Sequence, residues 1–172
     1  MSASDAATVR RPFPAAWLAV LSSARLSYLA TASITAGGVC VPHLSLMAMS
    51  FFNDPALGAV FVFSTRRDTQ KYENLRANPR VSILSHDFAP RGEAAAGGGD
   101  DRLSGSLSIT CQGTVRVLEG VEEERLRAEH LRRQPPHYSH FIAGPNIAVV
   151  VVAPEVAQAV GEGDRVERLG PF

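Results

Sequence analysis

The sequence predicts a mainly β (α+β) domain in which six strands form a small closed barrel with short peripheral helices. Three observations favour this fold. The 172 residues suffice for one domain, and 45% of them are hydrophobic. Six apolar, strand-like runs are separated by turn signals. Few segments have a helical pattern, and six strands with few helices in so short a chain favour a closed barrel.

The elements follow in order from local patterns. Pro12 and Pro14 introduce a short helix over 15–24, with apolar residues at helical spacing. The later elements are expected to be strands at 25–33, 39–52 and 59–64, a helix at 68–77, strands at 80–86 and 106–118, a helix at 121–133, and a last strand at 146–160.

Both later helices have clear end signals. The helix at 68–77 has Asp68 or Thr69 as its expected N-cap, and an Asn-Pro pair follows it. The helix at 121–133 carries acidic residues at its start and arginines at its end, as the helix dipole favours. A Pro-Pro pair then ends it.

Residues 12–172 are expected to form the single domain, preceded by a flexible N-terminus at 1–11. Residues 87–105 hold five glycines and four alanines and cannot bury a core face. We therefore expect a flexible surface loop inserted there. The strands on its two sides would pair as a long-looped hairpin.

Composition disfavours several classes of function. The 17 basic and 17 acidic residues balance, which argues against binding to nucleic acid or to an anionic membrane surface. No apolar stretch approaches the ~20 residues of a membrane span, and the start lacks an apolar signal core. Cys40 and Cys111 have neither metal-site nor disulfide spacing. A cytoplasmic protein is expected, although the Arg- and Ser-containing start leaves a transit peptide open.

Two strands are apolar on both faces. The last strand is apolar throughout 147–152. Along the second strand, one face holds His43, Ser45, Met47 and Met49, and the other holds Leu44, Leu46, Ala48 and Ser50. A small barrel needs only its inner face dry, so a second dry face indicates a partner, and a homodimer is expected. The alternative is that helices cover these outer faces.

Hydroxyls and cations gather where the third strand gives way to a helix. The residues before the helix that can bind a phosphate are Ser64, Thr65, Arg66 and Arg67. Lys71, the only lysine of the chain, falls in the first helical turn. A cation there opposes the helix dipole unless an anion offsets it. The pattern predicts a phosphate site; the alternative is a solvated helix start with Lys71 paired to Asp68 and Glu73.

Four segments together resemble the pyridoxamine 5′-phosphate oxidase-like family of FMN-binding split barrels. They are "LSYLATAS", "PHLSLMAMSF", "FVFSTRRDTQKYENLRANPRVSILSHDF" and "SITCQGTVRVLEG", and the likeness extends over roughly residues 12 to 160. The resemblance implies a six-stranded split barrel that forms homodimers, with FMN in clefts at the dimer interface.

The resemblance also implies binding roles for particular residues. Ser64 and Thr65 match the phosphate-contacting strand end, and Lys71 matches the phosphate lysine. The segment that would lie along the flavin ring and ribityl chain is Ser45, Leu46, Met47, Ala48, Met49 and Ser50.

The chain departs from the family pattern at several of these positions. Gln70 replaces an arginine, so Arg66 or Arg67 would supply the guanidinium. Ser45 and Ser50 replace an arginine and a lysine, and Ser108 replaces a glutamine that commonly contacts the flavin. The chain also lacks the Trp- and Arg-containing C-terminal segment of vitamin-B6 oxidases. It therefore resembles a shorter branch, with a substrate other than pyridoxine or pyridoxamine phosphate.

Further side chains have a plausible chemical role and a simpler structural one. Cys111 could be a redox thiol, but a buried strand cysteine is favoured. His43 could contact a ligand or bind haem, but a packed strand histidine is favoured. The other candidates are His130, His137 and His140, for which a metal site is not favoured, and Arg132 and Arg133, which could form a second anion patch with these histidines or a solvated helix end.

We expect an FMN-dependent oxidoreductase that acts on a small molecule. Because the flavin carries the redox chemistry, the protein would supply binding, orientation and electrostatics. No catalytic side chain is identified, and neither are the substrate and the electron donor. Two alternatives stay open: a split barrel that binds deazaflavin F420 or haem, and a non-catalytic flavin store or sensor.

Overall fold

The structure is a computed structural model that describes residues 12–88 and 107–172. The flexible N-terminus predicted for 1–11 lies outside the described residues. So does the loop insertion predicted for 87–105, apart from its first two residues.

All the predicted strands and helices are present, and the fold class is confirmed. The α-helices are α1 (Ala15–Ser23), α2 (Gln70–Ala77), α3 (Gly120–Arg133) and α4 (Ser139–Ile142). The strands are β1 (Leu26–Ile34), β2 (Cys40–Asp54), β3 (Gly58–Arg66), β4 (Arg80–His86), β5 (Ser108–Val117), β6 (Ile147–Val160) and β7 (Val166–Leu169). Short 3-10 turns lie at Pro136–Tyr138 and Glu162–Asp164. No helix in the described ranges is both long and apolar enough to cross a membrane.

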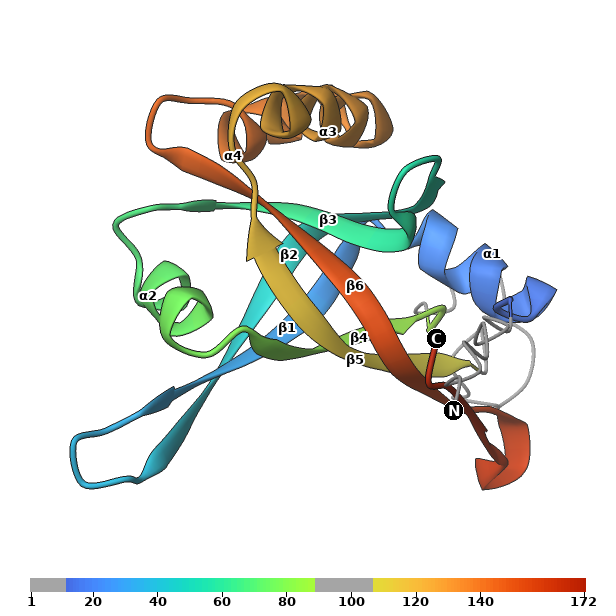
Figure 1. Cartoon of the computed structure of the whole chain (residues 1–172). Helices are drawn as coiled ribbons and strands as arrows, with labels where there is room; N and C mark the ends of the chain where they lie inside the picture. The colour runs from blue at the N-terminus through green and yellow to red at the C-terminus, as the bar shows by residue number, and fades with distance from the viewer. Residues whose placement is uncertain (1–11, 89–106) are drawn as a thin grey trace, which may run out of the picture.

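Six of these strands form a closed barrel (Figure 1). The hydrogen-bonded order is β3-β2-β1-β4-β5-β6, every pair is antiparallel, and a further pairing of β3 with β6 closes the sheet. The seventh strand, β7, pairs with the end of β6 and was missed by the sequence analysis. Its four residues, Val-Glu-Arg-Leu, are largely exposed. They are too few to show the alternation of apolar and polar residues that predicts a strand.

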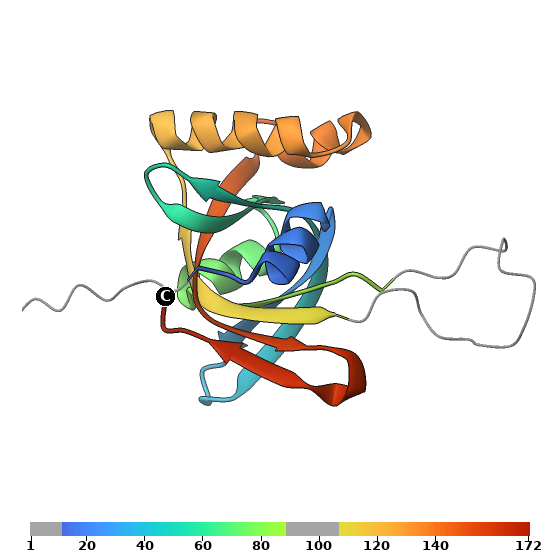
Figure 2. The same cartoon turned by 90° about the vertical axis from the view of Figure 1, so that its right-hand side faces the viewer.

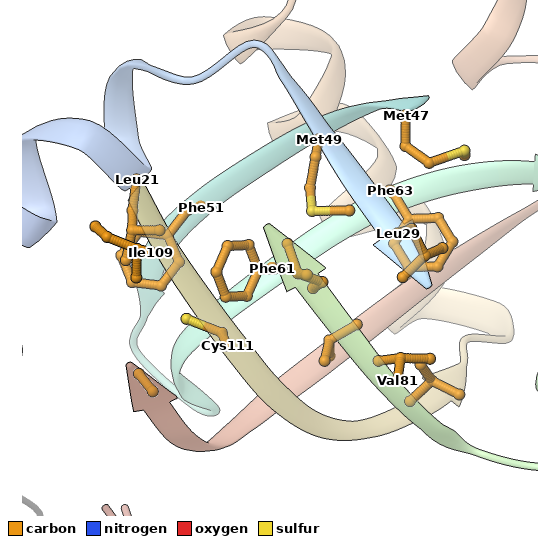
Figure 3. Close-up of a cluster of buried hydrophobic side chains, with 14 of the residues drawn as sticks. Leu21, Leu29, Met47, Met49, Phe51, Phe61, Phe63, Val81, Ile109 and Cys111 are labelled. Carbon is orange, nitrogen blue, oxygen red and sulfur yellow. The ribbon is translucent and has the colours of Figure 1, made fainter. Parts of the chain in front are cut away.

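The barrel interior is filled by side chains from all around the sheet (Figure 3). Leu29, Phe61, Phe63 and Ile109 are fully buried there. Helix α1 lies against one end of the barrel (Figure 2), where its Trp17 joins the same cluster. The inward residues alternate along each strand, as a period of two requires.

A second apolar cluster lies outside the barrel, under α3 (Figure 1). Val149 and Val151 of β6 meet Val62 of β3 and Leu126 of α3 in this cluster. The inference that the second apolar face of the last strand needs a partner subunit is therefore wrong, because the protein's own helix covers that face.

The outer face of the β1–β2 hairpin has no such cover among the described residues. Leu44 is 65% exposed and Leu46 is 55% exposed. Their register partners Ala30 and Tyr28 lie beside them on β1, and Leu26 continues the same face. The homodimer prediction therefore rests on this hairpin, which projects from the barrel (Figure 1).

Close packing at one glycine generates a stability prediction. Gly113 lies at a β-bulge of β5, and a Cβ atom there would stand 2.1 Å from the carbonyl oxygen of Ala153 on β6. Because backbone cannot move aside as a side chain can, Gly113→Ala should destabilise the fold by about 1–3 kcal/mol. Denaturant unfolding measures this change.

The matched control is Gly161→Ala, because a Cβ atom there would meet no atom closer than 3.9 Å. We expect its free energy of unfolding to stay within about 0.5 kcal/mol of the parent protein. Equal stabilities for the two variants would contradict the tight β5–β6 contact.

Candidate functional site

A cavity of about 420 Å³ opens where β3 ends and α2 begins. Its volume lies in the range of small-molecule sites. Its lining comes from β1–β3, the start of α2, and the segment from the end of α3 to β6, and comprises Leu26, Leu46, Met47, Ala48, Ser64, Thr65, Arg66, Thr69, Lys71, His130, Tyr138, His140, Phe141, Ile142 and Ile147.

The start of α2 is capped by Thr69, one of the two predicted residues. The Thr69 hydroxyl accepts a hydrogen bond from the Tyr72 backbone N–H at 3.3 Å and lies 3.4 Å from the hydroxyl of Thr65. Asp68 is engaged elsewhere: its carboxylate accepts from the guanidinium of Arg66, with Nε and Oδ1 2.9 Å apart. The strand end and helix start are thereby held next to the cavity.

Lys71 has no acidic partner among the residues that the structure describes. Its Nζ lies 2.7 Å from Sδ of Met47, and no described carboxylate lies within 4.0 Å. The alternative in which Asp68 and Glu73 pair with Lys71 is therefore not realised. Burial lowers the pKa of Lys71. A thioether is only a weak acceptor, so the ammonium group remains available to an anion.

Ser64 adds an unpaired hydroxyl to the same cavity. The residue is buried, and its Oγ has no hydrogen-bond partner among the described residues. Buried polar groups normally have partners, so an orphan hydroxyl in a cavity wall indicates a ligand contact. Together with Lys71 it fits a phosphate, which accepts hydrogen bonds and carries negative charge.

Both predicted arginines have a carboxylate nearby, and only Arg66 lines the cavity. Arg66 lines the cavity but is paired with Asp68. Arg67 lies outside the lining, where its Nη1 donates to the Tyr72 hydroxyl at 3.1 Å and its Nη2 lies 3.7 Å from a Glu123 carboxylate oxygen. Within the described lining, Lys71 therefore differs from Arg66 in having no carboxylate beside it that would compete with a bound anion.

The segment predicted to lie along the flavin divides between the cavity and the interior. Leu46, Met47 and Ala48 line the cavity. Ser45 contacts His43 instead, with Oγ and Nδ1 3.3 Å apart. Met49 points into the core (Figure 3). Neither of these two residues lines the cavity.

Three further predicted residues also lie outside the lining. Ser50 is buried, and its hydroxyl contacts Nδ1 of His130 at 2.8 Å. Gln70 donates to Oδ1 of Asn74 along α2. Ser108 begins β5, at the end of the barrel away from α2 (Figure 1).

The wall contributed by the 3-10 turn at Pro136–Tyr138 and by α4 was missed by the sequence analysis. It includes Tyr138, His140, Phe141 and Ile142. Arg127 of α3 holds this segment by donating to the backbone carbonyls of Ile142 and Ile147. The available sequence signal was the dense aromatic run "HYSHF", in which only His137 and His140 were considered, as metal or anion ligands.

His130 is the fully buried titratable group of the cavity. Burial, with a smaller effect from the nearby Arg127 charge, lowers the pKa of its imidazole to about 4, so the ring is neutral at pH 7. His140 lines the same cavity, whereas His137 does not. Among the described residues, no three His, Cys, Asp or Glu side chains are grouped as metal ligands.

Cys111 has no access to this chemistry. It lies inside the barrel (Figure 3), and burial raises the pKa of its thiol to about 12. The expectation of a buried strand cysteine is therefore confirmed, and the raised pKa disfavours the thiolate, which is the reactive form.

A second cavity, of about 630 Å³, lies between α1 and the C-terminal residues. It is lined by apolar side chains such as Phe13 and Phe172, and the single charged residue in its described lining is Glu155. This lining offers no cation to an anion, in contrast to the lining of the cavity at α2.

Comparisons with known proteins agree with this fold. A fission-yeast (Schizosaccharomyces pombe) pyridoxamine 5′-phosphate oxidase homolog is 26% identical over 137 residues, which cover 68% of this chain and 71% of the relative. A haem-binding protein from Mycobacterium smegmatis superposes with a TM-score of 0.65 at 22% identity, over 88% of this chain and 55% of that protein. A FAD-binding protein from Mesorhizobium loti superposes with a TM-score of 0.57 at 18% identity, over 86% of this chain and 94% of that protein.

The likeness to the two solved structures concerns the fold alone. The family assignment rests on a separate finding, a family model described as pyridoxamine 5′-phosphate oxidase that matches residues 13–161. This match includes the whole barrel and every described residue that lines the cavity at α2. The chain therefore belongs to the pyridoxamine 5′-phosphate oxidase family.

Proposed function

We propose that this protein binds FMN in the cavity at α2 and acts as an oxidoreductase on a small-molecule substrate. One observation carries the proposal: Ser64, whose hydroxyl has no partner among the described residues, and Lys71, whose ammonium group has no described carboxylate in reach, line the same cavity. These groups suit the phosphate of FMN, and Thr65 adds a hydroxyl beside them. Bound FMN would supply the redox chemistry.

The remaining walls suit a flat ring system. Leu46, Met47 and Ala48 offer an apolar strand on one side, and Tyr138 and Phe141 offer aromatic rings from α4 and the turn before it. Apolar walls bury the ring, while the anion site at one end fixes its direction. Ligand pockets are typically lined by apolar side chains, with a few polar groups that orient the ligand.

A homodimer completes this proposal. Leu26 and Leu46 belong both to the cavity lining and to the exposed outer face of the β1–β2 hairpin. A second copy that covered the hairpin would also close the open side of the cavity. The exposed apolar face therefore supports a dimer in which the ligand lies next to the interface.

The visible spectrum of the purified protein tests the choice of ligand. Flavin absorption bands, or bands restored by adding FMN, are expected, and mass spectrometry of the released molecule should identify FMN. A colourless protein that FMN cannot reconstitute would contradict the proposal.

Haem is the second candidate ligand, because a structural relative is described as haem-binding and two histidines line the cavity. A Soret band would favour haem. Quenching of F420 fluorescence without FMN binding would favour the deazaflavin. Bound FMN that neither NADH nor NADPH reduces, and that no acceptor reoxidises, would indicate a store or sensor in place of an enzyme.

Replacing Lys71 with alanine tests the anion site. We expect Lys71→Ala to weaken FMN binding by about 1.5–3 kcal/mol, the contribution of a hydrogen bond to a charged group. Fluorescence titration with FMN measures the change. Arg76→Ala is the matched control, since Arg76 is a cation in the last turn of the same helix and outside the cavity lining. Equal affinities for these two variants would show that Lys71 is an ordinary surface residue.

Replacing Leu44 tests the dimer. The parent protein should sediment at twice the 18.4 kDa of one chain, and Leu44→Glu should sediment as a monomer, because a carboxylate would be buried in the interface. Val121→Glu is the control, since Val121 is an 83% exposed apolar residue on α3. A monomeric parent protein at micromolar concentration would contradict the dimer.

A further inference from the structure

A chain of buried polar groups connects α3 to β2 beside the cavity. His130 is 0% exposed and lines the cavity, yet its Nε2 has no hydrogen-bond partner among the described residues. Its other ring nitrogen, Nδ1, lies 2.8 Å from the hydroxyl of Ser50. Gln134, one helical turn later, lies 3.2 Å from the same hydroxyl through its Nε2. Buried polar atoms normally have a hydrogen-bond partner, so this nitrogen needs one from outside the described residues.

The orientation of the Gln134 side chain follows from its second contact. Its Nε2 lies 2.7 Å from the backbone carbonyl oxygen of Met49, and a carbonyl can only accept a hydrogen bond. The atom facing Met49 must therefore be the amide nitrogen. One N–H donates to this carbonyl, and the other donates to Ser50.

Among Gln134, Ser50 and His130, only one atom is left to accept the proton of the Ser50 hydroxyl. Ser50 is buried, and the remaining atom within hydrogen-bond distance of its Oγ is Nδ1 of His130. If the hydroxyl donates to Nδ1, the Ser50 proton and both amide protons of Gln134 have acceptors, and only Nε2 of His130 lacks a partner. If Nδ1 donated instead, the Ser50 proton would lack an acceptor as well. A neutral imidazole that accepts at Nδ1 carries its proton at Nε2. The ring nitrogen without a partner is thus an N–H donor.

We propose that His130 contacts the ligand, and that Gln134 and Ser50 fix it as an Nε2–H donor to an uncharged acceptor such as a ring carbonyl or ring nitrogen. This assignment rests on the proposed function, because the ring system of FMN offers such acceptors. Lys71 would then select the charged end of the ligand and His130 its ring. A ring nitrogen that carries a proton is not a metal ligand, so the same tautomer argues against iron coordination by His130.

Nitrogen NMR of the ligand-free protein tests the tautomer without any flavin. In uniformly ¹⁵N-labelled protein, long-range ¹H–¹⁵N correlations distinguish Nε2–H from Nδ1–H imidazoles, and His130→Gln identifies the resonances. We expect Nε2–H at pH 7. Ser50→Ala should raise the Nδ1–H population, whereas Ser27→Ala should not, because the buried Ser27 hydroxyl pairs with Ser85 and with no histidine. An Nδ1-protonated ring in the parent protein would overturn the assignment.

Ligand addition then tests the contact itself. FMN should shift the His130 Nε2 resonance, whereas inorganic phosphate, which reaches only the anion site, should leave it in place. His130→Phe should bind FMN roughly 3- to 10-fold more weakly, as expected for one lost neutral hydrogen bond. His130→Gln, which retains an N–H donor, should bind within about twofold of the parent protein.

The two proposals fail in different ways. If FMN binds and Lys71→Ala weakens it, but His130 neither shifts nor affects affinity, the ligand contact of His130 is refuted while the proposed function stands. If FMN does not bind at all, the proposed function and the ligand contact both fail, and the tautomer measurement still decides whether Gln134 and Ser50 orient the ring.

Discussion

Closure of the barrel by the pairing of β3 with β6 is the constraint on which the site depends. This pairing continues to Arg66, beyond the last β2–β3 pair at Phe63, so β6 alone holds Ser64 and Thr65 in the sheet. The chain then turns directly into α2, whose cap, Thr69, contacts Thr65. The same closure brings β6 under α3, and Arg127 ties the α4 segment against it. Both walls of the cavity therefore depend on one strand pairing.

Lys71 differs from the arginines around this frame because it has no described carboxylate beside it. The arginines near the cavity are neutralised by carboxylates, Arg66 by Asp68 and Arg127 by Glu123. Lys71 lies half-buried against a methionine sulfur with no described carboxylate in reach. A buried ammonium group without an anion is unfavourable, and burial lowers its pKa accordingly. A bound phosphate would relieve this cost, which connects the electrostatics of the protein to its proposed ligand.

Sequence reasoning succeeded where the determining contacts are local. The Thr69 cap, the extent of α2 and the six barrel strands follow from neighbouring residues, and so does the collection of hydroxyls and cations at the end of β3. It failed where contacts are distant. The cover of β6 by α3, and the contacts of Ser50 with His130 and Gln134, 80 and 84 residues away, leave no periodic signal. Strand β7 is too short and polar to be recognised without β6 beside it.

The proposed phosphate site at the junction of β3 and α2 can be tested by comparing the binding of FMN with that of riboflavin. The two ligands share the ring and the ribityl chain and differ in the phosphate alone. We predict that the dissociation constant of riboflavin is about tenfold to hundredfold higher than that of FMN, the range given by charged hydrogen bonds to one anion. Equal dissociation constants would contradict the account, because the phosphate would then contribute nothing to binding.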